Sequence, residues 1–379
     1  MEYFLSFWEK ELYERYDLAV IGGGIVGVNA AITYKEQYPD QYVAIIERGT
    51  LPTGASTKNA GFACIGSMTE LLADAEENGW DPMLKVLANR WSGLRSLHTK
   101  VPAIEMDYHN WGGMEIFLDG EEEIFQVCRE KLPAMNAALA PITGHAETFT
   151  VCDEEIEGTG LTGVSHMILN RVEGQLHPGK MMAYLHQKAR SKGIQIFHGW
   201  TVVDIQTQSD GTVALNGSKG EVIQVSKAII ATNGFARKLL PDFDVTPVRN
   251  QVLITEPIPH LKLKGTFHYH QGYVYIRNVG NRVLIGGGRH LYRETETTDA
   301  FGLTDEIQTY LEDFLRSHIL KDINFQTAHR WSGILGVGKA KHPIIEECMP
   351  NVYSAVRLGG MGVAIGTLVG QEVVEAIQV

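Results

Sequence analysis

The first fifty residues alternate between hydrophobic runs and a glycine-rich turn. Residues 17–21 and 42–46 are short apolar runs that predict two buried strands, and residues 28–38 between them have the pattern of a helix. A strand, a turn, a helix and a second strand in this order are typical of the unit that opens a nucleotide-binding fold.

Three glycines mark the turn after the first strand. Gly22, Gly24 and Gly27 fit the pattern G-x-G-x-x-G. In this pattern the first glycine allows a tight turn, the second lets the backbone approach a pyrophosphate, and the third lets helix and strand pack closely. The N-terminus of the following helix adds amide donors and the positive end of its dipole.

An acidic residue completes the unit. Glu47 ends the second strand twenty residues after Gly27 (27 to 47), where a carboxylate accepts hydrogen bonds from an adenosine ribose. The sequence therefore predicts a dinucleotide site. Because a carboxylate at this position repels a 2′-phosphate, FAD or NAD is favoured over NADP.

The rest of the chain mixes helical and strand patterns. Helices are expected at 68–72, 81–98, 121–139, 181–192 and 304–318, and from the turn at 359–362 to residue 377. Strands are expected at 193–197, 201–208, 212–216, 222–225, 228–231, 248–255, 266–277, 282–287 and 352–356.

This order predicts a mixed fold, α/β with α+β. A Rossmann-like nucleotide domain is expected to be built from three discontinuous segments, residues 1–67, 164–245 and 326–379. Residues 68–163 and 246–325 are expected to form an inserted substrate-binding domain. Polar and apolar residues alternate along its predicted strands, which indicates a mostly antiparallel sheet.

Composition narrows the class of protein. The chain has 379 residues and a formal net charge of −12, and it carries no basic run, which argues against a nucleic-acid-binding protein. Its four cysteines are scattered without a C-x-x-C pair, which favours reduced thiols in a cytoplasmic protein.

The start of the chain lacks the features of a targeting segment. It has no basic region followed by an apolar core, and no stretch of about 18 apolar residues predicts a transmembrane helix anywhere in the sequence. Phe4, Leu5, Phe7 and Trp8 are expected to pack their short segment onto its own domain.

Several separated motifs together resemble the D-amino-acid oxidase-like family of FAD-dependent oxidoreductases, which includes glycine oxidase, sarcosine oxidase and gamma-glutamylputrescine oxidoreductase. The resemblance covers nearly the whole chain. Besides the opening unit, it rests on residues 53–62 (TGASTKNAGF), 174–178 (GQLHP), 231–235 (ATNGF), 255–257 (TEP), 331–333 (WSG), 343–345 (PII) and 359–363 (GGMGV).

The resemblance implies FAD as the cofactor. Residues 54–61 carry few bulky side chains, so their backbone can lie flat against the cofactor, and the turn at 359–362 can donate amides to the flavin C2 oxygen. Lys58 either offsets a phosphate charge or is an ordinary solvated lysine. The expected cofactor contacts are Gly22, Gly24, Gly27, Glu47, Arg48, Ser56, Thr57, Lys58, Asn59, Ala60, Gly61, Val203, Thr232, Gly234, Gly333, Gly359, Gly360, Gly362 and Val363.

Candidate catalytic residues lie in the predicted strand 266–277. Tyr273, Tyr275 and Arg277 share one face of a strand, where two phenols and a guanidinium suit an anionic or amino-acid substrate. The alternative is a solvent-facing polar side of a sheet. His270 is a further candidate on the same strand. His268 and His270 alternate along it, but without carboxylate or cysteine partners they predict no metal site.

The chain departs from relatives within the resemblance at three places. Residues 334–336 lack the arginine with which glycine oxidase and D-amino-acid oxidase bind a carboxylate, so this role would fall to Arg277. Residues 331–341 lack the cysteine to which sarcosine oxidase attaches its flavin, which implies non-covalent FAD. Residues 283–286 lack the lysine with which sarcosine oxidase activates oxygen, so a dehydrogenase remains an alternative.

The expected function is oxidation of a C–N bond in a small amine or amino acid by hydride transfer to flavin N5. Oxygen is the expected acceptor, giving hydrogen peroxide. One alternative is a dehydrogenase, acting on a C–N or C–OH bond, that passes electrons to a quinone or a carrier protein. A second alternative is a non-catalytic flavin-binding subunit of a larger complex.

Overall fold

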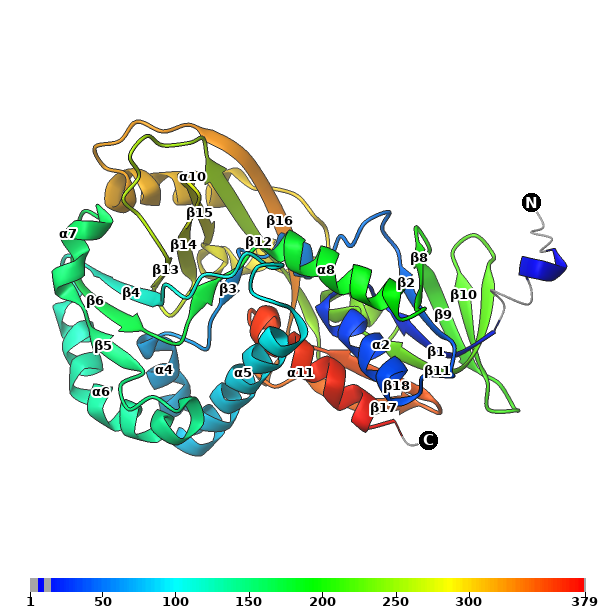
Figure 1. The fold of residues 1–379 in the computed structure, drawn as a ribbon. Coiled ribbons are helices and arrows are strands. Elements are labelled where there is room, and N and C mark those ends of the chain that lie inside the picture. Colours follow the sequence, from blue (N-terminus) through cyan, green and yellow to red (C-terminus); the bar gives the residue numbers. More distant parts are fainter. Residues whose placement is uncertain (1–5, 10–14, 378–379) are drawn as a thin grey trace.

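The computed structural model describes residues 6–9 and 15–377. Two eight-stranded sheets dominate it, one in each half of the molecule as drawn in Figure 1. None of the helices in the described ranges has the length and apolarity needed to cross a bilayer.

The first sheet has the central order β17-β18-β11-β1-β2-β8, and β9 and β10 extend it from β11. β1 pairs in parallel with β11 on one side and with β2 on the other, so the chain diverges to both sides of β1. The strands are β1 (Arg15–Ile21), β2 (Val43–Glu47), β8 (Gln195–His198), β9 (Val202–Thr207), β10 (Val213–Gly217), β11 (Val222–Ile230), β17 (Ile344–Met349) and β18 (Val352–Val356).

Both faces of this sheet are buried, which explains the uninterrupted apolar runs. Leu18 and Val20 of β1 pack with the helices α2 (Ile25–Gln37), α8 (Pro178–Ser191) and α11 (Gly362–Glu375). Ala19 and Ile21 point the other way and pack with side chains of the β9–β10 hairpin. Residues 18–21 of β1 and 43–46 of β2 are therefore hydrophobic at every position.

The second sheet has the order β16-β12-β15-β14-β13-β4-β6-β5. Its pairs are antiparallel apart from β13 and β4, which are parallel. The strands are β4 (Gly113–Leu118), β5 (Phe149–Val151), β6 (Val164–Asn170), β12 (Thr246–Thr255), β13 (Thr266–Tyr269), β14 (Val274–Val279), β15 (Arg282–Gly287) and β16 (Thr327–Val337).

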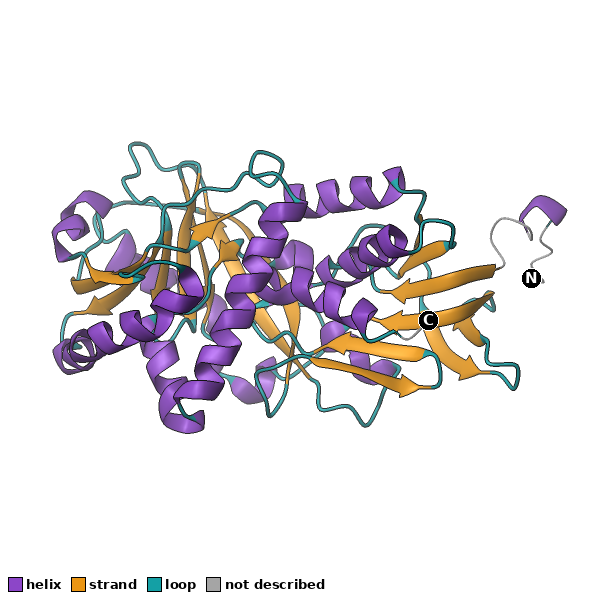
Figure 2. Cartoon of the chain, turned by 60° about the horizontal axis from the view of Figure 1, so that its bottom comes forward, coloured by secondary structure: helices purple, strands orange, loops and turns teal. Residues whose placement is uncertain are grey.

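Helices surround the second sheet and connect it to the first (Figure 2). α5 passes so close to α11 that a Cβ on Gly93 would lie 2.1 Å from the Ala364 carbonyl oxygen. The remaining elements are α3 (Ala55–Lys58), α4 (Met68–Asn78), α5 (Trp80–Lys100), α6 (Glu122–Thr143), α7 (Ile156–Thr159), α9 (Arg293–Glu296), α10 (Asp305–Phe314), the short helices η1 (Asp153–Glu155), η2 (Asn233–Lys238), η3 (Arg289–Leu291) and η4 (Leu315–Ile319), and the paired strands β3 (Phe62–Ala63) and β7 (Gly174–Gln175).

The mixed fold class predicted from the sequence is confirmed, but two of the strand predictions are wrong. The strands predicted at 222–225 and 228–231 are one continuous strand, β11. Residues 266–277 form two antiparallel strands, β13 and β14, rather than one. The turn between them contains His270, Gln271 and Gly272, all with positive φ. Gly272 tolerates that conformation without strain. β13 has already ended at Tyr269, although the polar and apolar alternation of the sequence continues through the turn.

Two other expectations can be compared with the structure. Phe7 and Trp8 are 63% and 75% exposed, so the expectation that they pack onto the domain is wrong; Phe4 and Leu5 lie outside the described residues. β6 and β16 fall in ranges predicted for the nucleotide domain but belong to the second sheet. The domain boundaries stay a prediction.

Candidate active site

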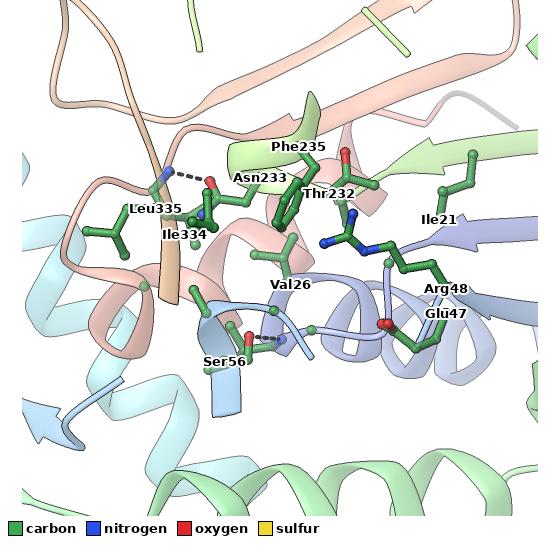
Figure 3. A pocket seen from close by; sticks show the side chains of 18 of the residues that line it. Ile21, Val26, Glu47, Arg48, Ser56, Thr232, Asn233, Phe235, Ile334 and Leu335 are labelled. Carbon is green, nitrogen blue, oxygen red and sulfur yellow. Dashed lines mark hydrogen bonds between the residues drawn. The ribbon is translucent and has the colours of Figure 1, made fainter. Parts of the chain in front are cut away.

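A groove follows the carboxyl ends of β1, β2 and β11 in the first sheet. Its walls include Gly22 after β1. Arg48 after β2, Thr232 after β11 and Ser56 of α3 also line it (Figure 3). The crevice at the carboxyl ends of parallel strands, where the chain diverges to both sides, is where open α/β sheets bind nucleotides.

The glycine turn gives this groove its backbone wall. A Cβ on Gly27 would lie 2.0 Å from the Gly22 carbonyl oxygen, which explains why helix and strand require glycine there. Gly24 is the N-cap residue of α2 and lines the groove without a capping side chain. Ser56 Oγ accepts a hydrogen bond of 2.9 Å from the Ile25 amide and thereby ties α3 to the start of α2.

Glu47 lies at the predicted ribose position. Its carboxylate is 6% exposed, with Oε2 accepting from the Gly23 amide at 3.0 Å and Oε1 accepting from the Gly49 amide at 2.9 Å. Each carboxylate oxygen has a second lone pair, so the group can still accept hydrogen bonds from two ribose hydroxyls.

Two further side chains define the groove wall shown in Figure 3. The Arg48 guanidinium carbon lies 3.7 Å from the centre of the Phe235 ring, which orients this cation along the wall. Thr232 Oγ1 is buried and has no hydrogen-bond partner among the described residues. An orphaned buried hydroxyl in a groove requires a ligand or water to satisfy it.

The last helix begins where the groove meets a second cavity. Asn233 Oδ1 accepts hydrogen bonds from the amides of Arg357 and Leu358, both at 3.1 Å, and fixes the turn before α11. Gly359 has φ of +57°, and α11 starts at Gly362 without a side-chain cap. Its first amides are therefore available to an anionic group in the groove.

The predicted cofactor residues divide into three sets. Gly22, Gly24, Glu47, Arg48, Ser56, Asn59, Thr232, Gly359, Gly360, Gly362 and Val363 line the groove. Lys58, Ala60, Gly61 and Gly333 line the second cavity, as do Asn59, Gly359, Gly360 and Val363. Gly27, Thr57, Gly234 and Val203 line neither.

Val203, predicted to contact the cofactor, does not line the groove, whereas its neighbour Val202 does. Val203 is 52% exposed on β9, whereas Val202 is buried and lines the groove. Because side chains alternate along a strand, a shift of one residue moves a side chain to the opposite face.

The second cavity adjoins the groove and lies against the second sheet. Its volume is about 420 Å³, and its wall includes Phe62 after the α3 loop, Tyr273 and Tyr275 near β14, and the start of α11. The rings of Phe62 and Tyr275 meet edge to face with centres 5.7 Å apart. A Cβ on Gly286 would lie 2.4 Å from the Tyr275 ring, so glycine on β15 makes room for this phenol.

Arg289 supplies the cation of this cavity. It follows β15, lines the cavity and is only partly exposed, with its guanidinium carbon 5.6 Å from the centre of the Tyr273 ring. Burial lowers the pKa of Arg289, and its guanidinium takes part in no ion pair or hydrogen bond among the described residues. A partly buried, unpaired guanidinium is a strong anion site.

An amide and a phenol lie close together in the same cavity. Asn250 Oδ1 is buried and unpartnered among the described residues, and the Asn250 amide lies beside the Tyr275 hydroxyl. Burial raises the pKa of Tyr275 to about 12, which keeps its hydroxyl protonated at neutral pH. The cavity therefore offers an acceptor at Asn250, a hydroxyl at Tyr275 and a cation at Arg289.

Arg277 and His270 do not take the places predicted for them. Arg277 is 6% exposed and does not line the cavity. Its Nη1 donates to the carbonyl oxygens of Ala60 (3.0 Å), Gly61 (3.0 Å) and Leu176 (2.8 Å), so it holds the backbone beside the cavity. Burial lowers the pKa of Arg277 to about 10, and it stays charged at neutral pH. His270 lies in the exposed turn after β13.

A buried ionic network forms the far wall of the cavity. Glu70 accepts from Arg90 at 2.9 Å and lies 3.8 Å from Lys341, which also pairs with Asp74. Burial alone would raise the pKa of Glu70, but Arg90 and Lys341 together lower it. Glu70 is therefore an anion whose charge is balanced within the protein.

These observations fit FAD. The groove has a glycine turn at a helix N-terminus, the carboxylate of Glu47 at the end of β2 and an orphaned hydroxyl at Thr232. The second cavity continues from it at Gly359 and Gly360, where a flavin ring would extend from the groove.

The chain belongs to the DAO family, described as FAD dependent oxidoreductase, whose sequence profile matches residues 17–376. It is therefore an FAD-dependent oxidoreductase. The matched residues include the strands of both sheets.

Among its relatives is the glycine oxidase of Geobacillus kaustophilus, 24% identical over 371 residues, which cover 93% of this chain and 88% of that protein. The fold is similar to that of L-proline dehydrogenase from P. horikoshii, with a TM-score of 0.75, 18% identity and coverage of 96% and 93%. It is also similar to iminodiacetate oxidase from Chelativorans sp. BNC1, with a TM-score of 0.74, 18% identity and coverage of 95% and 94%.

Sequence reasoning missed Arg289, Asn250 and Val202. Arg289 follows three consecutive glycines at 286–288, and a cation directly after a glycine run at the end of a strand was a usable signal. The residues around Asn250 in the sequence do not mark it as a site residue, because Asn250 lies beside Tyr275 and shares a cavity with Arg289 only after strands that are distant in the sequence have paired.

Proposed function

We propose that this protein oxidises a C–N bond of an amino acid or a related amine that carries a carboxylate. The observation that carries this proposal is the unpaired, partly buried Arg289 in the cavity next to the FAD groove. The printed names of similar proteins support it, since glycine oxidase, L-proline dehydrogenase and iminodiacetate oxidase are all named for amino-acid substrates.

The chain's own residues bind and orient the substrate. Arg289 receives the carboxylate, and the aromatic rings of Tyr273 and Tyr275 limit its position. Asn250 Oδ1 accepts a hydrogen bond from the substrate amine, which satisfies the orphaned amide oxygen. The contacts of the carboxylate with Arg289 and of the amine with Asn250 lie on either side of the reacting carbon. Together they fix which C–H bond of the substrate faces away from these residues.

FAD, when bound, supplies the two-electron acceptor by taking up a hydride at its N5 atom. The start of α11 provides uncapped amides and a positive dipole end, which favour negative charge beside it. The imine product then reacts with water to give a carbonyl compound and an amine or ammonia.

We propose oxygen as the final acceptor, giving hydrogen peroxide. Residues 283–286, buried on β15, include no lysine, so any oxygen-activating charge would have to come from elsewhere, and Lys58 and Lys341 in the cavity wall are the candidates. A dehydrogenase that uses a quinone or a carrier protein is the alternative.

Anaerobic reduction tests the proposal. The purified protein is mixed under nitrogen with amino acids, N-methyl amino acids, polyamine conjugates and hydroxy acids, and the visible flavin absorption is followed before and after air is admitted. We expect bleaching by a carboxylate-bearing amine and rapid recovery in air. If the flavin absorption recovered only after a quinone was added, the acceptor would be a quinone rather than oxygen. If only hydroxy acids bleached the flavin, the proposed oxidation of a C–N bond would be wrong.

A further inference from the structure

Three side chains that commonly bind metals meet in the wall of the second cavity. Cys64 Sγ, a carboxylate oxygen of Glu173 and a ring nitrogen of His268 all lie within 4.8 Å of one another. Cys64 follows β3, Glu173 precedes β7 and His268 lies on β13, so three separate segments converge here. The sequence alone predicted no metal site because His268 had no cysteine or carboxylate partner in view.

The carboxylate is held in a fixed orientation. Glu173 Oε1 accepts hydrogen bonds from the amides of Ile65 (2.7 Å) and Gly66 (2.9 Å) and from Asn170 Nδ2 (3.1 Å). Its other oxygen, Oε2, lies 3.0 Å from His268 Nε2. One oxygen is thus anchored and the other is presented to the histidine, which is how protein metal sites orient their carboxylate ligands.

The distances suit a small tetrahedral ion. With bonds of about 2.0 Å to nitrogen and oxygen and about 2.3 Å to sulfur, ligand atoms around zinc lie about 3.3 to 3.6 Å apart. The 3.0 Å between Glu173 Oε2 and His268 Nε2 is close to this value. Cys64 Sγ lies within 4.8 Å of both, so it needs to approach by at most about 1.3 Å to reach this spacing.

Charge balance also permits a divalent ion. Glu173 is fully buried and His268 is 7% exposed, so an unbalanced charge would be costly here. A thiol beside an imidazolium–carboxylate pair is neutral overall. A divalent ion bound by a thiolate, a carboxylate and a neutral imidazole is neutral as well, because two protons leave when the ion enters.

The ligand types select the ion and leave one position open. Sulfur, nitrogen and oxygen ligands together suit Zn²⁺ better than the hard cations Mg²⁺ and Ca²⁺. Cys64 and His268 both line the cavity that also holds Arg289. We propose that Cys64, Glu173 and His268 form a zinc site whose fourth position opens into this cavity, where it takes water or an oxygen, nitrogen or sulfur atom of the substrate.

Metal content provides the first test. The FAD-containing protein is produced with zinc in the medium, desalted, and analysed for zinc by mass spectrometry, with flavin absorption as the check on folding. We expect close to one zinc per chain, lost in Cys64→Ser and His268→Asn and kept in Cys348→Ser, a half-buried thiol elsewhere. Less than a tenth of an equivalent of zinc per chain in the unaltered protein would overturn the proposal. Glu173 and His268 would then be a buried ion pair without a metal.

X-ray absorption at the zinc edge tests the ligands in the unaltered protein, which covers the case in which a variant fails to fold. We expect one sulfur at about 2.3 Å and nitrogen or oxygen neighbours at about 2.0 to 2.2 Å. Zinc coordinated without sulfur, or zinc content unaffected by both substitutions, would place the ion elsewhere and overturn the site.

Discussion

The FAD groove and the second cavity are built by different means. The groove includes glycine turns that belong to short local motifs, at Gly22–Gly24 and at Gly359–Gly362, beside Glu47 and Arg48 at the end of β2. The cavity consists of side chains from distant segments, with Asn250 on β12, His268 on β13 and Arg289 after β15.

This difference explains which residues can be recognised from a sequence. A site that uses backbone amides needs glycine at fixed spacings, because a Cβ would block the approach. A site that uses side chains leaves no spacing rule, since the strands bring its members together only after they pair. Substitutions in the two regions should therefore fail in different ways.

Gly27→Val should have the largest effect. Its Cβ would lie 2.0 Å from the Gly22 carbonyl oxygen, so β1 and α2 could not pack, at a cost of about 3 kcal/mol or more. We expect the FAD-bound protein to be lost, measured as flavin per chain and by urea unfolding.

The matched control is Gly158→Ala in α7, which lines neither the groove nor the second cavity and where a Cβ meets nothing within 4 Å. Its FAD content should match that of the unaltered protein. Equal FAD content in the Gly27→Val protein would show that the glycine turn tolerates a side chain. It would contradict the statement that the groove requires glycine at this spacing.

Arg289→Ala should affect the substrate and leave the cofactor in place. Losing a partly buried charged contact should lower kcat/KM for a carboxylate-bearing amine by about 2–3 kcal/mol, roughly 30- to 150-fold. Flavin content should not change. Arg293→Ala, an exposed neighbour, is the control and should keep full activity. If Arg289→Ala also kept it, the carboxylate would have to bind elsewhere.

Arg277→Ala should act on stability instead. Its removal leaves the carbonyl groups of Ala60, Gly61 and Leu176 without their shared donor, which should cost about 1–3 kcal/mol in the free energy of unfolding. Urea unfolding measures the loss. A selective rise in KM for carboxylate substrates, with stability unchanged, would return Arg277 to the substrate-binding role predicted from the sequence.

The smallest effect should come from His166, which lines neither site. Burial lowers its pKa, but hydrogen bonds to Asp153 and Glu122, both 2.7 Å, raise it overall. The pKa of His166 is therefore higher in the folded protein than in the unfolded chain, where it is about 6.5. The contribution of His166 to the free energy of unfolding is complete below about pH 6.5 and is lost as the pH rises through the pKa of the folded protein.

Urea unfolding at pH 5.5 and pH 8.5 measures this contribution. The unaltered protein should exceed His166→Gln by up to about 1 kcal/mol more at the lower pH. His145→Gln, an exposed histidine, should show no such difference. A larger gap at pH 8.5 would contradict the direction, and a change in FAD content would contradict the separation of His166 from both sites.

Much of the fold followed from local pattern. Apolar runs identified β1, β2 and β11, because strands buried on both faces must be hydrophobic throughout. The break between β13 and β14 was missed because alternation continues across Gly272. Val203 was predicted to contact the cofactor, but alternation along β9 places Val202 in the groove and leaves the Val203 side chain exposed.

The sequence by itself predicted Gly22, Gly24 and Glu47 as members of a dinucleotide site, since a backbone that accepts a dinucleotide needs these residues at fixed spacings, and all three line the groove. Only the tertiary structure decided that Arg277 holds backbone, that Arg289 faces the cavity, and that His268 meets Cys64 and Glu173. The physical reason is that side-chain chemistry depends on neighbours, and strand pairing brings together neighbours that lie up to hundreds of residues apart in the sequence.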